Sequence, residues 1–318
     1  MSQPPGTGKY EQMLVRCQGL HPVPTAVAHP CDETSLAAAV EAGALGLIVP
    51  ILVGPAARIR RLAEEAKLEL DGLELVDTPH SHASAAKAIE IVRAGRADAL
   101  MKGSLHTDEL MGEVLQADTG IRTARRVSHA FVMDVPMYAK PLFITDAAIN
   151  IFPTLEDKVD IVQNAIDLAH ALGIPEPKVA ILSAVETVTS KLPSMIDAAA
   201  LCKMAERGQI RGAKVDGPLA FDNAVSREAA AMKGIVSDVA GDADILLVPD
   251  LEAGNMLAKE LTFLADADAA GIVLGARVPI ILTSRADNLR TRMASCAVAV
   301  LYAHATRTAT MPIGTLTG

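Results

Sequence analysis

Aromatic side chains are scarce in this sequence: Phe, Trp and Tyr together make up 3% of 318 residues, and tryptophan is absent. The hydrophobic core must therefore be built from Ala, Val, Ile, Leu and Met, which typically fill the space between helices and a parallel sheet. A surface for stacking nucleic-acid bases is excluded as well, because such surfaces depend on aromatic rings.

Basic residues are also fewer than acidic ones, 29 against 38, and the net charge is −9. A general nucleic-acid-binding protein would show a basic face, so we expect no nucleic-acid partner. An anionic ligand would need a local group of cations, and Arg122, Arg125 and Arg126 form one just before an apolar stretch.

Cysteine is rare, and the four cysteines are too far apart to form a Cys-x-x-Cys pair. We expect reduced thiols in a cytoplasmic protein, because the first residues also lack the charged-then-apolar order of a signal peptide. The longest uncharged run, residues 42–57, is interrupted by glycines and prolines. It is shorter than the roughly 20 apolar residues of a membrane-spanning helix, so no membrane association is expected. No His or Cys cluster has metal-ligand spacing, and we expect neither a metal nor a cofactor.

The sequence does contain a regular alternation of short apolar runs with helical patterns. Residues 25–28, 47–53, 73–76 and 97–101 are expected strands with helices between them, and Asp32 and Thr154 are expected helix N-caps. This order is typical of a parallel sheet covered by helices on both faces. Residues 130–135 and 142–145 leave no room for a helix between them and predict a hairpin. The alternation then resumes, so we place a domain boundary near Thr145.

One strand end combines three reactive groups, in the segment Pro279-Ile-Ile-Leu-Thr-Ser-Arg-Ala-Asp287. A short buried strand is expected there, followed at once by a hydroxyl, a guanidinium and a carboxylate. Ligands bind at the carboxyl ends of strands in open α/β sheets, and an Arg fork suits a phosphate group. The alternative is a Ser N-cap with a solvated Arg at an ordinary helix start.

Several further motifs appear together with this one. They are Met101-Lys-Gly-Ser104, Arg126-Val-Ser-His129, Thr145-Asp146, Leu182-Ser-Ala-Val-Glu186, Gly217-Pro-Leu-Ala-Phe-Asp-Asn-Ala-Val-Ser226 and Pro249-Asp-Leu-Glu-Ala-Gly-Asn-Met256. In this order the set resembles the phosphate acetyltransferase/phosphate butyryltransferase family, and two of the motifs look closer to the butyryltransferase branch.

The resemblance implies an α/β fold of two domains with a cleft between them, shared with isocitrate and isopropylmalate dehydrogenases. The domains would comprise residues 1–145 with 275–318, and an inserted domain of residues 146–274. It also implies a homodimer and the reaction acyl-CoA + phosphate ⇌ acyl phosphate + CoA. CoA and acyl-CoA are substrates here, and no cofactor is implied.

The same resemblance suggests roles for individual residues. Arg285 would bind the phosphoryl group and Ser284 would hydrogen-bond the reacting thiol or carbonyl. Thr291 stands where the acetyltransferase branch has its base, so Asp287 is the candidate base, with a helix N-cap as its alternative role and His129 as the second candidate. The remaining candidate residues would bind substrate: Lys102, Ser104, Arg126, Ser128, Asp222, Asn223, Asp250 and Asn255.

Three other functions stay open at this level. A metal-dependent β-decarboxylating dehydrogenase could use the same fold, although it needs clustered carboxylates and a dinucleotide site that the sequence does not show. The chain could also be a non-catalytic acyl-CoA-binding protein. Such a protein needs no base, which would explain why a threonine, Thr291, stands where the acetyltransferase branch has one. The chain could also act beside a fused or separate hydratase, and the preferred acyl chain length is not determined.

Overall fold

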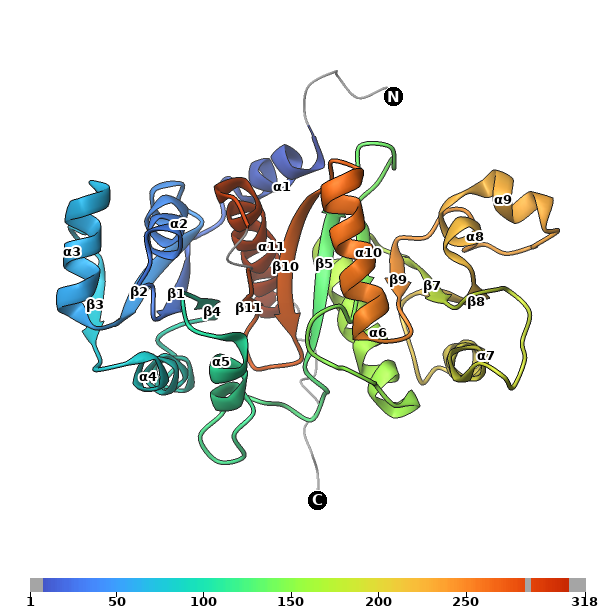
Figure 1. Cartoon of the computed structure of the whole chain (residues 1–318), viewed down its shortest axis with the longest axis horizontal. Coiled ribbons are helices and arrows are strands. Elements are labelled where there is room, and N and C mark those ends of the chain that lie inside the picture. The colour runs from blue at the N-terminus through green and yellow to red at the C-terminus, as the bar shows by residue number, and fades with distance from the viewer. Residues whose placement is uncertain (1–7, 284–286, 309–318) are drawn as a thin grey trace. The chain divides into compact units, whose positions relative to one another are not determined.

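The structure is a computed structural model that describes residues 8–283 and 287–308 (Figure 1). The chain divides into two compact units, one formed by the residues up to Arg125 and from Ala270 onward, the other by Arg126–Ala269. The first boundary therefore lies before the hairpin and not after it at Thr145. The physical reason is that the second hairpin strand pairs with a later strand of the second unit.

The first unit contains a mixed sheet with the strand order β3-β2-β1-β4-β11-β10. All of its neighbouring strands are parallel except β10 and β11, which are antiparallel. The strands are β1 (Val23–Ala28), β2 (Ile48–Gly54), β3 (Glu74–Asp77), β4 (Ala99–Lys102), β10 (Asp268–Leu274) and β11 (Ile280–Ile281). The expected parallel sheet is thus present, with one antiparallel pair that the sequence did not predict.

Helices connect these strands, and in Figure 1 α4 and α5 lie together, away from α2 and α3. Their bounds are α1 (Lys9–Cys17), α2 (Glu33–Ala44), α3 (Ala56–Ala66), α4 (Ser81–Arg93), α5 (Thr107–Val114) and α11 (Leu289–Thr308). Helix α2 begins at the expected N-cap, because the Asp32 carboxylate accepts the Ser35 amide hydrogen bond at 2.7 Å. The start of this helix was therefore readable from the sequence.

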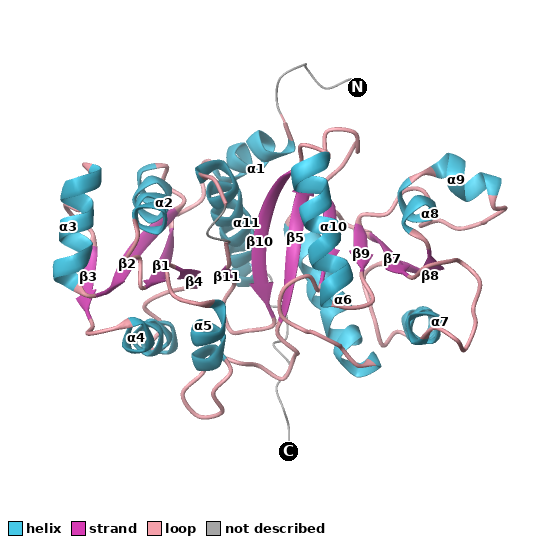
Figure 2. Ribbon diagram, in the orientation of Figure 1, coloured by secondary structure: helices cyan, strands magenta, loops and turns pink. Residues whose placement is uncertain are grey.

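Within the second unit the strands follow the order β5-β6-β9-β7-β8. Strands β5 and β6 form the predicted antiparallel hairpin, and the other neighbours are parallel. The strands are β5 (Ser128–Asp134), β6 (Leu142–Thr145), β7 (Lys178–Leu182), β8 (Lys214–Leu219) and β9 (Ile245–Leu247). The helices, cyan in Figure 2, are α6 (Leu155–Ala171), α7 (Pro193–Glu206), α8 (Phe221–Val225), α9 (Arg227–Met232) and α10 (Leu251–Leu264). Helix α6 opens with the expected capping box between Thr154 and Asp157.

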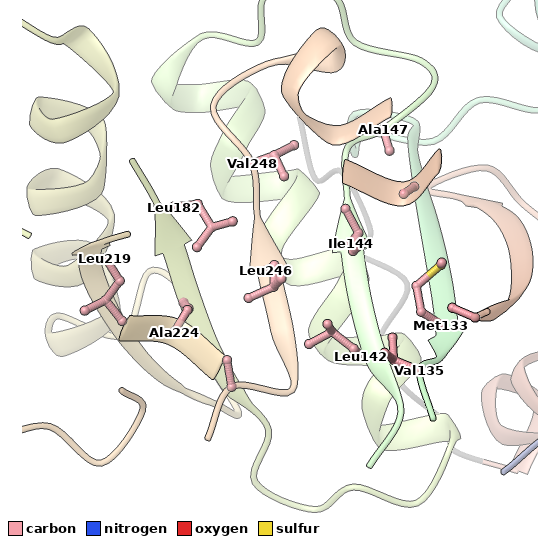
Figure 3. Packing of buried hydrophobic residues seen from close by; sticks show 14 of the residues in the cluster. Met133, Val135, Leu142, Ile144, Ala147, Leu182, Leu219, Ala224, Leu246 and Val248 are labelled. Atoms are coloured by element: carbon pink, nitrogen blue, oxygen red, sulfur yellow. The ribbon is translucent and has the colours of Figure 1, made fainter. Parts of the chain in front are cut away.

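Aliphatic side chains form the core of the second unit (Figure 3). Met133 of β5, Ile144 of β6, Leu246 of β9 and Leu182 of β7 belong to one cluster of buried residues. This confirms the composition argument that Ala, Val, Ile, Leu and Met must supply most of the core. Among the described residues, no helix is long and apolar enough to cross a membrane.

Candidate functional site

The loop after β4 lies against the end of β1. Gly103 is required at this contact, since a Cβ there would overlap the carbonyl oxygens of Ala28 and His29. The Ser104 hydroxyl donates to the His29 carbonyl at 3.0 Å and accepts from the Cys31 amide at 3.2 Å. Gly103 and Ser104 therefore connect the end of β4 to the end of β1, both in the first unit.

Lys102, the last residue of β4, is buried rather than exposed, with 5% of its surface accessible. Its ammonium donates hydrogen bonds of 3.2 Å to the carbonyl oxygens of Gly103 and Leu105. An ammonium in this position is a local source of positive charge beneath the loop, because burial weakens screening by water.

A pocket of about 420 Å³ opens beside this loop. Nine residues from four chain segments line it: His29, Cys31, Asp32, Arg58, Ser81, Ser104, Leu105, His106 and Glu109. Arg58 donates to the Cys31 carbonyl at 2.7 Å, and Glu109 accepts from the Ser81 hydroxyl at 2.7 Å. Of this set, the sequence predicted only Ser104 as a substrate-binding residue, because the segments are distant along the chain and share no motif.

Ser284 and Arg285 lie outside the described residues, but the residues on either side of 284–286 are described. The buried guanidinium of Arg292 donates to the Thr283 hydroxyl at 3.0 Å and to the Asp287 carbonyl at 3.2 Å. It thus links the end of the β11 segment to the start of α11. The sequence analysis missed Arg292, although a cation among the small apolar residues of this helix was a possible signal.

Asn288, and not Asp287, caps α11. Its side-chain oxygen accepts the Thr291 amide hydrogen bond at 2.8 Å. The alternative role of Asp287 as the N-cap is therefore wrong. Asp287 is partly buried, and its role as a base stays a prediction.

In the second unit, Arg126 is held at its backbone and at its side chain. The backbone amide of Arg126 donates to the Asp160 carboxylate at 2.8 Å, and its backbone carbonyl accepts from the side-chain amide of Asn164 at 2.9 Å. The guanidinium Nε donates to the Asn150 side-chain oxygen at 2.7 Å, while 53% of the Arg126 side chain remains exposed. A fixed and accessible guanidinium is suited to binding an anion.

Ser128 and His129 both lie inside the second unit. The Ser128 hydroxyl accepts from Asn164 at 2.9 Å, which occupies it with a structural contact. Burial lowers the pKa of His129 to about 3, its Nδ1 has no partner among the described residues, and its ring packs edge-on against Phe131. An imidazole with this pKa is neutral at pH 7 and poorly matched to proton transfer there, which argues against His129 as an acid or base.

Asp222 and Asn223 lie at the start of α8. Asn223 is fully buried and donates to the Glu186 carboxylate at 3.0 Å, while its own side-chain oxygen has no partner among the described residues. Lys233 contacts both Asp222 and Glu186 at 3.3 Å. Two motifs that are separate in the sequence, those containing Glu186 and Asn223, therefore meet in one polar group.

Asp250 and Asn255 fasten α10 to the turn that follows β6. Asp250 is the N-cap of α10 and accepts from Ala253 at 2.9 Å, and Asn255 donates to the Ala147 carbonyl at 3.3 Å. Between them, a Cβ on Gly254 would stand 2.9 Å from the Asp146 carbonyl oxygen. The observed contacts of this motif are thus structural, and they position residues 146–150.

Comparison with known proteins identifies the family. A family model described as "Phosphate acetyl/butaryl transferase" matches residues 82–300. A phosphate acetyltransferase of Rhizobium meliloti is 66% identical over 96% of this chain and 97% of its own length. A phosphate butyryltransferase of Clostridium acetobutylicum is 43% identical over 92% of this chain and 96% of its own length. The higher identity to the acetyltransferase does not favour the butyryltransferase branch that the motifs suggested.

Solved structures agree with this assignment. A branched-chain phosphotransacylase from Enterococcus faecalis V583 superposes with a TM-score of 0.77 at 31% identity, over 88% of this chain and 99% of that one. A 4-hydroxythreonine-4-phosphate dehydrogenase from Klebsiella pneumoniae has a TM-score of 0.56 at 13% identity, over 88% of this chain and 99% of that one, which is a likeness of fold alone. The chain therefore belongs to the phosphate acetyl/butyryltransferase family of acyltransferases.

Proposed function

We propose that this chain transfers a short acyl group between CoA and inorganic phosphate, with acetyl as the preferred group. The observation that supports this most directly is the 66% identity, over nearly the whole chain, to a protein named phosphate acetyltransferase. We expect the fold to be shared with dehydrogenases. The match to the 4-hydroxythreonine-4-phosphate dehydrogenase structure, at a TM-score of 0.56, supports this expectation. Family membership does not favour the dehydrogenase reaction itself.

The exchange needs a deprotonated thiol, a phosphate held in line with the carbonyl carbon, and stabilisation of the carbonyl oxyanion. We assign Arg285 to the phosphoryl group and Ser284 to the thiol or carbonyl on the strength of the motif. Arg126 is assigned to a phosphate group of one of the substrates, because its guanidinium is both held and exposed. Asp287 is assigned as the base on the strength of the same motif, in which it is the nearest carboxylate to Ser284.

No metal takes part in this scheme, because each requirement of the exchange has a candidate side chain. Dialysis against EDTA should then leave the rate of acyl transfer unchanged. Inactivation that Mg²⁺ or Mn²⁺ reverses would contradict the scheme and support the metal-dependent dehydrogenase alternative.

We also propose that the chain forms a homodimer. Helix α10 supports this, because it exposes large apolar side chains: Met256 is 64% exposed, Phe263 75% and Leu264 81%. Exposed apolar groups on one helix are typical of protein–protein contacts. Light scattering on Phe263→Lys should then show a larger monomer fraction than for the unchanged chain.

The proposed reaction is tested by mixing the protein with CoA and acetyl, propionyl or butyryl phosphate, and measuring thioester formation. Acetyl phosphate should give the highest kcat/KM. CoA binding without thioester formation would instead indicate a non-catalytic binding protein. Reduction of NAD with a 2-hydroxy acid as substrate would indicate the dehydrogenase.

A further inference from the structure

A chain of hydrogen bonds in the second unit leads from a buried carboxylate to the guanidinium of Arg126. We propose that Asp146 and Asn150 are positioning residues that fix this guanidinium in the orientation in which it binds a phosphate group. This inference rests on the proposed function, in which Arg126 contacts a phosphate of the substrate. It assigns roles to two residues that do not themselves touch the substrate.

The chain begins at Asp146, of which 2% is exposed. One carboxylate oxygen accepts from the amides of Ala148 and Ile149 at 2.9 and 3.0 Å. The other accepts from the amide of Asn150 at 3.2 Å and from its side-chain nitrogen at 2.6 Å. Burial raises the pKa of Asp146, and these hydrogen bonds oppose that shift. With two N–H donors on each oxygen, the group acts as an acceptor only, as an ionised carboxylate does.

Asn150, which is 4% exposed, transmits this fixed geometry. Its nitrogen donates to the Asp146 carboxylate and, at 2.9 Å, to the Val127 carbonyl, so both amide hydrogens are engaged. The amide therefore has one orientation, and its oxygen must face Arg126. A flipped amide would place N–H groups against the guanidinium and against neither acceptor.

Arg126 makes the last hydrogen bond of the chain: its Nε donates to the Asn150 side-chain oxygen at 2.7 Å. The neutral amide of Asn150 fixes the guanidinium without adding negative charge. The same Nε also forms an ion pair with one oxygen of the Asp157 carboxylate at 3.5 Å, a longer contact, while the other oxygen accepts from the Thr154 amide in the capping box. An Arg side chain loses rotamer entropy when it is fixed, so holding it in advance favours binding of the anion.

Helix α10 stabilises the turn that contains Asp146. Gly254 packs against the backbone of residues 146 and 147, and Asn255 donates to the Ala147 carbonyl. The position of Asp146 is therefore set by helix packing as well as by its own hydrogen bonds. Removal of the Asn150 side chain should leave this turn in place and release mainly the guanidinium.

The test compares Asn150→Ala with the unchanged chain in acetyl-CoA formation and in the reverse reaction. KM is measured separately for phosphate, acetyl phosphate and CoA. The KM of the substrate whose phosphate group contacts Arg126 should rise about tenfold, which is the usual effect of a lost hydrogen bond to a charged group. KM for the other substrates should change little. Gln163→Ala is the matched control, because it removes an amide of α6 whose hydrogen bonds among the described residues go to the backbone of Arg211 and the side chain of Asp167. It should leave every KM unchanged.

A double-mutant cycle shows whether Asn150 acts through Arg126. In an Arg126→Ala background, Asn150→Ala should raise that KM no further. An equal rise in both backgrounds would mean a general structural role and would overturn the proposal. So would an unchanged KM in the single Asn150→Ala variant while Arg126→Ala raises it.

Two other outcomes separate this inference from the proposed function. If the unchanged chain forms no thioester, the proposed function itself fails. If thioester forms and Arg126→Ala leaves each KM unchanged, the reaction stands and the positioning inference is overturned. Circular dichroism checks that each variant folds, and Asn150→Ser replaces Asn150→Ala if the latter does not fold. Asn150→Ser should also raise the KM, because its shorter side chain does not span the distance to the guanidinium.

Discussion

A cluster of three cations around Asp242 in the second unit leads to a quantitative prediction for Asp242→Asn. Lys140 lies 3.1 Å from one carboxylate oxygen, and Lys178 and Arg227 contact the other. Burial alone would raise the pKa of Asp242, but hydrogen bonds from Lys178 and Lys140 lower it from 3.8 to about 2. At about 1.4 kcal/mol for each pKa unit, ionised Asp242 should contribute about 2 kcal/mol to the free energy of unfolding.

The sign of the pH dependence follows from the lowered pKa. The stabilisation is fully present above 3.8, the pKa in the unfolded chain, and it is lost as the pH falls through the folded value of about 2. Asp242→Asn should therefore lower the free energy of unfolding by about 2 kcal/mol at pH 7, with roughly half of that difference remaining at pH 3.

Urea unfolding, followed by far-UV circular dichroism at pH 7, 5, 4 and 3, measures this difference. The matched control is Asp238→Asn, which removes a carboxylate that also pairs with a lysine, Lys214 at 2.9 Å, but is 75% exposed. The control should change stability much less, because water screens an exposed pair. A difference for Asp242→Asn that is the same at pH 3 and pH 7, or no larger than that of the control, would refute the reasoning.

Three further predictions concern the proposed reaction and the packing of α10. Arg285→Ala should reduce kcat/KM on the order of 10²–10³-fold, as loss of a transition-state hydrogen-bond donor does, with an unchanged melting temperature; near wild-type kcat/KM would mean that Arg285 is a surface residue. Asp287→Asn should slow turnover on the order of 10²–10⁴-fold, and the loss should shrink as pH approaches the thiol pKa of ~8.5, where thiolate forms unaided. Turnover that is unchanged at every pH would exclude Asp287 as the base. Gly254→Ala should lower the free energy of unfolding by about 1–3 kcal/mol, because the added Cβ meets the Asp146 carbonyl oxygen at 2.9 Å; urea unfolding checks this, and an unaltered midpoint would show that α10 is not tightly packed there.

Much of the fold was predictable because its signals are local. The alternation of apolar runs and helical patterns depends on residues a few positions apart, and so do the N-caps at Asp32 and Thr154. The two prolines between residues 135 and 142 left no room for a helix, and the hairpin of β5 and β6 follows from that. The family was predictable for another reason, since its motifs are contiguous runs of residues in a fixed order.

The unit boundary and the burial of the candidate residues were decided by tertiary structure. The pairing of β6 with β9 places the hairpin in the second unit, and these strands are about a hundred residues apart in the chain. Lys102 was a candidate for substrate binding and His129 a candidate acid or base, but both are buried. Burial depends on which elements cover a strand, and short-range patterns contain no information about that.

The same limit applies to the polar contacts of the candidate site. Arg126 was predicted to bind a phosphate group, but Asp146 and Asn150, which hold it, come from the turn after a later strand. Arg292 escaped notice because its contacts to Thr283 and Asp287 form only when α11 packs beside β11. By itself the sequence determined the elements, the family and the residue types that the chemistry needs. Only tertiary structure decided which of those side chains are accessible and which are fixed by others, because hydrogen-bond geometry and solvent exclusion arise from contacts between distant segments.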